Sequence, residues 1–395
     1  MSTPSVHKPV RVKSTWITYL LMGAYGMWVY TFGATQVLLR EEQGTSRTIA
    51  ALHGSAWALG LVIMSFFNAR ITAALGRGKT MRLGALIMIL GALLYTSGLP
   101  TAVTLFATVV VAIGGALVIA GVSAFLSMQQ GLAAPAALSE AAGMGAFLGL
   151  IGAFTVGLFV ILTLGWRPAV WVLVVYLVIL ELIRGRNVAA YNIGEIAHQA
   201  GRVRDLPPIF WWTAFTMLPA AGVEYCVALW SADLLQDRGH LGSGAAAAAL
   251  ACFGVGLTLG RFLGGRVAER MDPERLLAGA FAFSCVGLLI LWTTSNPVLM
   301  MILLVLIGLG VALQWPLAIG RSIRCAPELS DRASGTAIVA AGFSVMVAPF
   351  ALGAMADAWG LRTAFLVVPV LAALGVALVL FRPVPVLIEG QPTAS

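Results

Sequence analysis

The chain has 395 residues, of which 60% are hydrophobic and only 10% are charged, and its formal net charge is +8. A soluble globular protein carries about 25% charged residues, because its surface must be hydrated. The composition therefore excludes an ordinary soluble domain and indicates that most of the chain faces lipid.

Twelve apolar runs follow one another along the chain. A helix needs about 20 apolar residues to cross roughly 30 Å of hydrocarbon, whereas a membrane barrel shows short alternating segments of about ten residues. These runs are continuous and rich in Leu, Ala and Gly. They predict an all-α membrane protein with twelve transmembrane helices, at about 16–39, 47–68, 81–99, 101–127, 139–164, 168–185, 209–235, 244–267, 275–294, 297–320, 333–356 and 361–382.

The basic residues are distributed unevenly between the predicted loops. If the N-terminus is cytoplasmic, the cytoplasmic loops and helix ends hold most of the 24 Lys and Arg residues, with clusters at 8–13, 70–82, 184–204 and 261–275. The positive-inside rule then places both termini in the cytoplasm. We expect a multi-pass protein of the plasma (inner) membrane, and the net charge does not imply a nucleic-acid partner.

The second half of the chain repeats features of the first. LSEAAG (138–143) and LSDRASG (329–335) open the fifth and eleventh spans, and GWRPAVWVLV (165–174) and GLRTAFLVVP (360–369) open the sixth and twelfth. The polar stretch 186–208 separates the two series. We therefore predict two parallel six-helix halves, residues 1–185 and 209–395, joined by a cytoplasmic linker at 186–208. Twelve-helix transporters that bind a solute near the midplane are built in this way.

This organisation resembles the major facilitator superfamily. That family carries a basic and acidic signature, G-x-x-x-[D/E]-R-x-G-x-x-[R/K], after its second span and an echo after the eighth. The echo is the better copy here, with Gly265, Glu269, Arg270 and Arg275 in place. In the N-terminal copy GRGK (76–79) is present, but Ala73 occupies the acidic position. The resemblance implies the twelve-helix fold and a transport function.

The same resemblance implies a cytoplasmic gate in the loop signature. Exposed ion pairs contribute about a kcal/mol or less each, which suits a latch that opens in every cycle. The candidate gate residues are Gly265, Glu269, Arg270, Arg275 and Arg261. Arg261 lies inside the eighth span, as a snorkelling anchor or as the partner of a buried acid or a carbonyl group.

Few ionisable residues lie at membrane depth, where each is costly and is a functional candidate. Glu224 lies near the centre of the seventh span, Asp233 lies nearer the outer end of that span, and His53 lies in the outer third of the second. A carboxylate in low dielectric can carry and release a proton, so Glu224 is the main candidate for proton coupling. Asp233 is either a second site or an outer helix end, and His53 is either a proton relay or a packing residue.

The segment GVEYCVALWSADLL (222–235) is loosely similar to the sugar-permease branch related to fucose transporters. The first and fourth spans lack the membrane-depth acids that those sugar symporters use. The midplane holds no cluster of Lys or Arg, which disfavours a multiply anionic substrate, and a neutral, amphipathic or cationic solute fits better. The candidate cavity-lining residues are polar or aromatic: Tyr25, Trp28, Gln36, Trp57, Gln129, Tyr225, Trp230, Gln314 and Trp315.

The sequence carries no Walker loop, zinc-ligand spacing or nucleophile elbow, so we expect no cofactor, no metal and no enzyme activity. We predict a secondary active transporter, monomeric in the bilayer, that moves a small organic solute by alternating access with proton coupling. One alternative is a proton-antiport exporter of drugs or metabolites, although the fifth span GMGAFLGLIGAFTVG (143–157) lacks the proline of drug antiporters. A remote alternative is a non-transporting membrane sensor.

Overall fold

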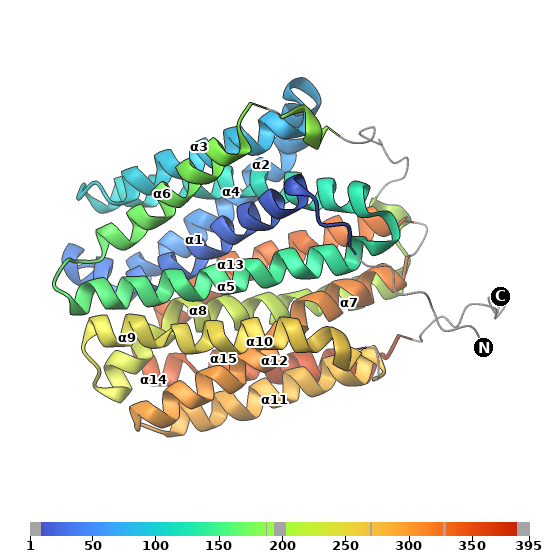
Figure 1. The fold of residues 1–395 in the computed structure, drawn as a ribbon. Helices are drawn as coiled ribbons and strands as arrows, with labels where there is room; N and C mark the ends of the chain where they lie inside the picture. The colour runs from blue at the N-terminus through green and yellow to red at the C-terminus, as the bar shows by residue number, and fades with distance from the viewer. Residues whose placement is uncertain (1–8, 187, 193–202, 269–270, 327–328, 385–395) are drawn as a thin grey trace.

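The computed structural model describes residues 9–186, 188–192, 203–268, 271–326 and 329–384, and every regular element in these ranges is a helix. Two groups of helices lie against each other in Figure 1. The N-terminal group comprises α1 (Lys13–Gln43), α2 (Arg47–Leu75), α3 (Arg77–Tyr95), α4 (Thr101–Gln130), α5 (Ala134–Ile161) and α6 (Arg167–Arg184). The C-terminal group comprises α7 (Pro208–Phe215), α8 (Met217–Gly239), α9 (Ser243–Ala249), α10 (Ala251–Ala268), α11 (Pro273–Thr293), α12 (Pro297–Arg324), α13 (Ser330–Trp359), α14 (Leu361–Ala364) and α15 (Val367–Phe381). Short 3₁₀ turns lie at Gly131–Ala133, Ala189–Tyr191 and Val203–Asp205.

These elements combine into the twelve predicted spans, and the predicted fold class is confirmed. Three spans are each made of two consecutive helices, namely α7 with α8, α9 with α10 and α14 with α15. Within the described residues, nine helices are long and apolar enough to cross a membrane by length and composition alone. The other three spans are more polar. The span of α1 is rich in Thr, Tyr and Gly, α6 carries Arg167, Glu181 and Arg184, and α8 carries Glu224 and Asp233.

Glycines allow close helix packing within each group. A Cβ atom on Gly84 of α3 would lie 2.7 Å from the carbonyl oxygen of Gly114 on α4, and one on Gly26 of α1 would collide with the backbone of Gly145 on α5. In the C-terminal group, Gly256 of α10 lies against the backbone of α12 near Gly308. Small residues of this kind bring helix backbones together in membranes, where packing replaces the hydrophobic effect as the cause of association.

The two groups meet along three seams. α2 packs against α13, α5 packs against α9 and α10, and α1 packs against α8. The seams use the same small-residue packing, since Gly33 of α1 lies against the carbonyl oxygen of Ala228 on α8 and Gly157 of α5 lies against Ala248 of α9. The central side chains of α1, α8 and α10 therefore face one another between the groups.

Buried and partly buried ion pairs tie helix ends within each group. In the C-terminal group, Glu274 at the start of α11 accepts from Arg321 Nε at 2.8 Å and from Arg324 Nη2 at 2.7 Å, both on α12. In the N-terminal group, Glu181 of α6 pairs with Arg82 of α3 at 2.9 Å. These acids anchor neighbouring helices of one group and do not join the two groups.

Candidate functional site

Glu224 lies at the centre of the contact between the two groups. Its side chain comes from α8 and is only 9% exposed. Its Oε1 atom accepts a hydrogen bond from the Tyr30 hydroxyl of α1 at 3.1 Å and one from Arg261 Nη2 of α10 at 3.3 Å. A buried carboxylate normally needs such partners, because an unpaired buried charge is costly. One acid thus joins α1 of the N-terminal group to α8 and α10 of the C-terminal group.

Arg261 reaches Glu224 from a position closer to the end of its helix. Side chains in an α-helix lean toward the helix N-terminus, and this lean carries the Arg261 side chain from the last turns of α10 toward the middle of the molecule. Its Nη1 atom also donates to the carbonyl oxygen of Ala142 on α5 at 3.1 Å. Of the roles that the sequence allowed for Arg261, the structure shows partnership with a buried acid and with a carbonyl group.

Aromatic side chains from both groups pack against one another at Tyr225, the residue that follows Glu224. The Trp57 ring of α2 stacks on Tyr25 of α1 with centroids 6.1 Å apart, and it lies 5.2 Å from the Tyr225 ring of α8. Within the described part of the chain, the buried Trp57 Nε1 has no hydrogen-bond partner. We call Tyr25, Trp57 and Tyr225 the aromatic panel.

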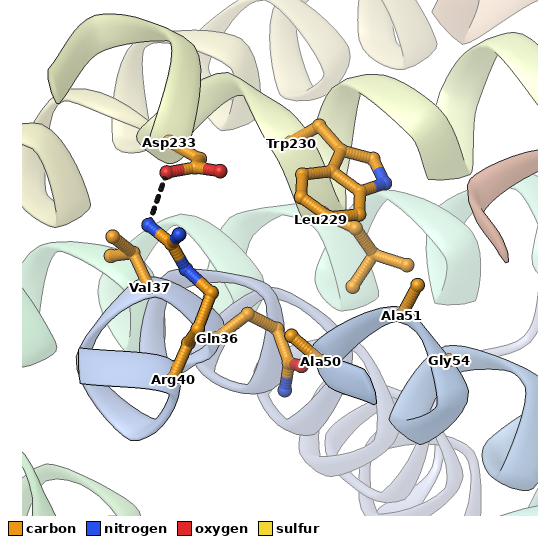
Figure 2. A pocket seen from close by; sticks show the side chains of 9 residues that line it. All are labelled: Gln36, Val37, Arg40, Ala50, Ala51, Gly54, Leu229, Trp230 and Asp233. Atoms are coloured by element: carbon orange, nitrogen blue, oxygen red, sulfur yellow. Dashed lines mark hydrogen bonds and ion pairs between the residues drawn. The ribbon is translucent and has the colours of Figure 1, made fainter. Parts of the chain in front are cut away.

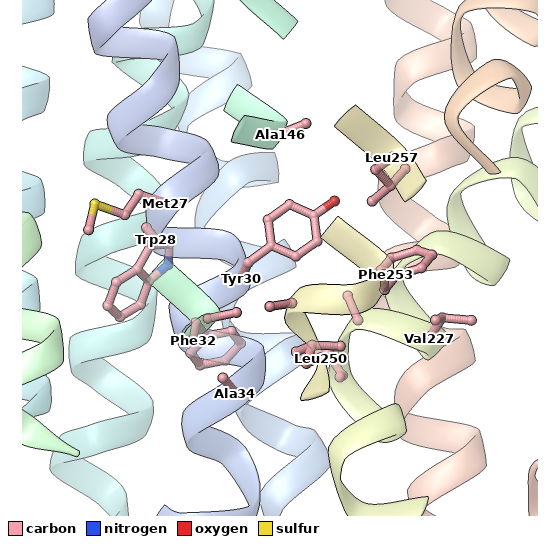
Figure 3. Close-up of a cluster of buried hydrophobic side chains, with 14 of the residues drawn as sticks. Met27, Trp28, Tyr30, Phe32, Ala34, Ala146, Val227, Leu250, Phe253 and Leu257 are labelled. Atoms are coloured by element: carbon pink, nitrogen blue, oxygen red, sulfur yellow. The ribbon is translucent and has the colours of Figure 1, made fainter. Parts of the chain in front are cut away.

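Tyr30 and Trp28 leave α1 in different directions (Figure 3). Tyr30 points toward α10, where its ring centroid lies 6.4 Å from that of Phe253. Trp28 is fully buried on the other side, stacked 5.5 Å from Phe32 and edge-on to Tyr95. The structure therefore places Trp28 in the interior of the N-terminal group and brings Tyr30 to Glu224.

Asp233 forms a second buried cluster at the end of the molecule away from the termini. Its side chain accepts from Arg40 Nη2 of α1 at 2.6 Å and from Arg47 Nε of α2 at 2.8 Å. Figure 2 shows the pair with Arg40, and both side chains line a small cavity of about 20 Å³. Beside it, Asp357 of α13 accepts from the backbone N–H groups of Arg47 and Thr48 at 2.9 and 2.7 Å. We call these four residues the distal cluster: Asp233, Arg40, Arg47 and Asp357.

His53 is held within the N-terminal group. It is 1% exposed, its Nε2 lies 2.9 Å from Thr104 Oγ1 of α4, and its Nδ1 lies 3.2 Å from the Ala50 carbonyl oxygen. These neighbours fit the packing interpretation of this histidine better than the relay, since no contact joins it to Glu224 or Asp233.

The remaining predicted cavity residues occupy several places. Gln36 donates to the Tyr95 hydroxyl at 3.2 Å, and Trp230 Nε1 donates to the Pro349 carbonyl oxygen at 3.0 Å. Both side chains line the small cavity beside Asp233 (Figure 2). Trp315 is half-buried and packs in the cluster that contains Trp57.

The two other glutamines lie away from the central pair. Gln129 accepts from the Thr15 hydroxyl at 2.9 Å, near the start of α1, and Gln314 of α12 donates to Ser284 of α11 at 3.0 Å. Each therefore links helices within one group.

The predicted gate is only partly within the described residues. Gly265 lies in α10, whereas Glu269 and Arg270 lie outside the described residues. Arg275 is exposed, and its backbone N–H donates to Asp272, which caps α11. The loop signature drew attention to these residues, but the buried acid among the described residues of this region is Glu274, which is not a position of that motif.

Sequence reasoning also missed Arg40 and Arg47 as functional candidates. Arg40 directly follows the first predicted span and Arg47 opens the second, and the structure shows both holding Asp233. The signal that could identify them is charge balance, because a buried acid near a helix end requires a basic partner from a neighbouring helix. Among the described residues, no three His, Cys, Asp or Glu side chains gather as a metal site requires.

Comparison with known proteins identifies the fold. Residues 208–394 match the family model described as Major Facilitator Superfamily, and no curated protein sequence matches the chain. Three solved structures share the fold, each at low sequence identity. A bacterial homologue of the human lysosomal transporter Spinster, in an inward-facing and unoccupied conformation, is 13% identical with a TM-score of 0.74 over 94% of this chain and 97% of its own. The fucose:proton symporter FucP of E. coli is 17% identical with a TM-score of 0.65 over 94% and 100% of the two chains. The nucleoside transporter NupG is 12% identical with a TM-score of 0.75 over 93% and 98%.

Proposed function

We propose that this chain, which belongs to the major facilitator superfamily by its fold and by the match of its C-terminal half, moves a small organic solute by proton-coupled alternating access. The observation that carries the proposal is the Glu224 site, where one buried carboxylate is held by residues of both helix groups. Any change in the charge of Glu224 alters contacts between the groups, so protonation and relative movement of the groups are linked.

The architecture supports a division into two moving units. We assign residues 1–185 and 209–395 to two six-helix halves and 186–208 to a linker on the cytoplasmic side, with both termini in the cytoplasm. In Figure 1 the two groups lie against each other. The protein would act as a monomer in the plasma membrane, with the lipid bilayer around its exposed apolar helix faces.

Protonation of Glu224 supplies the coupling step. The ionised carboxylate attracts the Arg261 guanidinium and accepts the Tyr30 hydroxyl, so it holds α1, α8 and α10 together. Protonation weakens both bonds, because a hydrogen bond to a charged group contributes about 1.5–3 kcal/mol and one between neutral groups about 0.5–1.5 kcal/mol. The loss is therefore roughly 1 kcal/mol or more per bond. This energy is comparable with the few kcal/mol that separate two conformations of a protein.

The distal cluster supplies a gate on the outer side. Asp233 and Asp357 belong to the C-terminal group, and the arginines that they hold belong to the N-terminal group. The ion pairs therefore close this end of the molecule, and they must separate when it opens. We retain Gly265, Glu269, Arg270 and Arg275 as the gate of the opposite end, on the strength of the family signature.

The proposal is tested in proteoliposomes once a solute is identified by a thermal-shift screen, since a ligand that binds the folded state raises its stability. We expect an imposed pH gradient to drive solute accumulation by the wild-type protein. Glu224→Gln should abolish this accumulation while solute exchange without a gradient continues in part. The direction of the gradient that drives accumulation separates symport from antiport export.

Asp237→Asn is the matched control, because Asp237 is an exposed acid of the same helix, 3.6 Å from Arg47. Gradient-driven accumulation by Glu224→Gln at the wild-type rate would refute the coupling role. Failure of any solute to be moved by the wild-type protein would refute transport itself.

A further inference from the structure

We propose that the Glu224–Arg261 site takes a small organic monocarboxylate with an apolar body, which binds together with the coupling proton. This inference rests on the proposed function and narrows the solute to one chemical class. It follows from the charge balance of the site, from its excess of hydrogen-bond donors and from the aromatic panel beside it.

The charge balance of the site favours an anionic ligand. In the structure the Glu224 carboxylate compensates the Arg261 guanidinium, whose side chain is only 19% exposed. Protonation of Glu224 removes this compensation and leaves a positive charge in a poorly hydrated site, which is costly. A monoanion that enters with the proton restores a neutral site, whereas a cation would meet an uncompensated guanidinium.

The other charged groups near the pair already have partners. On α8, Asp233 is held by Arg40 and Arg47. On α5, which packs against α10, Glu140 pairs with Arg11. On α12, Arg321 pairs with Glu274. The remaining titratable groups that face Glu224 are the hydroxyls of Tyr25, Tyr30 and Tyr225, and each is neutral in the ordinary pH range. The carboxylate that replaces Glu224 must therefore come from the ligand.

The hydrogen-bond donors of the site also favour a monocarboxylate. When Glu224 is protonated, Arg261 and the Tyr30 hydroxyl lose their anionic acceptor. The Trp57 indole N–H is a buried donor that has no acceptor among the described residues. A carboxylate offers two oxygens to a guanidinium in a forked geometry and further lone pairs to such donors. A second carboxylate on the ligand would bring a charge with no basic partner, so a dicarboxylate is disfavoured.

The aromatic panel accounts for the apolar body. Tyr25, Trp57 and Tyr225 stand face to face or tilted at 5.2–6.1 Å, and flat apolar surfaces of this kind favour stacking with an apolar or aromatic group. The sequence alone suggested a neutral, amphipathic or cationic solute, because no cluster of Lys or Arg occurs at the midplane. The structure shows that the Arg261 side chain contacts Glu224, and this contact brings a basic group into the central site.

Binding of benzoate and of its neutral analogue benzamide tests the proposal, with affinity measured by tryptophan fluorescence and thermal shift on the full-length protein. For the wild type, benzoate affinity should fall up to about tenfold per pH unit as pH rises, because one proton binds with the anion. Glu224→Gln mimics the protonated acid, so this variant should bind benzoate tightly at all pH values.

Three further variants separate the contributions of the guanidinium, of the indole N–H and of overall positive charge to benzoate binding. Arg261→Gln should lose benzoate binding by tenfold or more, as expected of a charge-assisted bond, while benzamide binding changes little. Trp57→Phe keeps an aromatic side chain and removes the indole N–H, so affinity should fall about tenfold. Arg362→Gln, at an exposed arginine stacked on Trp292, is the control for loss of one positive charge.

Two results would overturn the inference. One is that Glu224→Gln, folded as judged by its thermal midpoint, binds neither benzoate nor any other aliphatic or aromatic monocarboxylate in a panel. The other is that benzamide or a cationic analogue binds better than benzoate in a proton-dependent manner. The second result would leave proton-coupled transport intact and refute only the assignment of the solute class.

Discussion

Asp233→Asn should open the end of the molecule that the distal cluster closes. Asp233 is 3% exposed and accepts from Arg40 at 2.6 Å and from Arg47 at 2.8 Å. Asparagine retains one carbonyl oxygen, so it can serve one arginine and loses a charge-assisted bond to the other. Such a bond contributes about 1.5–3 kcal/mol. A shift of about 2 kcal/mol corresponds to roughly a 30-fold change in the ratio of closed to open forms.

The change is measured as the rate at which a cysteine reacts with a membrane-impermeant maleimide. Ala51 is the position of choice, because it lines the cavity beside Asp233 and is only 5% exposed. In a background without the native cysteines, Asp233→Asn should raise the labelling rate of Ala51→Cys about 30-fold.

Asp237→Asn serves again as the control, since its carboxylate is 42% exposed and lies 3.6 Å from Arg47. Exposed pairs contribute about a kcal/mol or less, so this variant should change labelling only slightly. The interpretation of the distal cluster as a gate is refuted if Asp233→Asn labels at the wild-type rate, or if both variants accelerate labelling equally.

Three other substitutions probe packing and the central site. Glu274→Gln leaves the fully buried Arg321 uncompensated and should destabilise the protein by about 3–5 kcal/mol, seen as a lower thermal midpoint that the exposed-acid variant Glu41→Gln does not show. Gly26→Ala should lower the midpoint through overpacking by about 1–3 kcal/mol, because a Cβ there meets backbone atoms of α5, whereas Gly279→Ala, which points into open space, should be neutral. Tyr30→Phe removes the hydroxyl that donates to Glu224 and should slow solute exchange about tenfold. Exchange at the wild-type rate would show that this bond has no part in the cycle.

The sequence contained most of the fold. Long apolar runs have few alternatives to spanning helices, so the spans and their number could be inferred from composition. The positions at which helices are interrupted could not be inferred in this way. The breaks at Thr216 and Leu250 occur inside continuous apolar runs, where the local sequence carries no stop signal as strong as a charged loop.

The central site could be predicted only in part. Glu224 stands out because it is a lone acid inside a span, and that signal needs no knowledge of the fold. Its partners Tyr30 and Arg261 lie 194 and 37 residues away, and only the packing of α1, α8 and α10 brings them together. The family motif directed attention to Gly265, Glu269, Arg270 and Arg275. Two acids that form buried ion pairs, Asp233 and Glu274, are not positions of that motif.

The most direct test of the account is the proton movement that accompanies solute uptake, recorded with a pH-sensitive dye trapped in proteoliposomes. For the wild-type protein, addition of a transported solute should change the internal pH at a rate that follows solute flux. Glu224→Gln should exchange solute with no change of internal pH. Equal proton movement in the two proteins would contradict the assignment of Glu224 as the coupling residue.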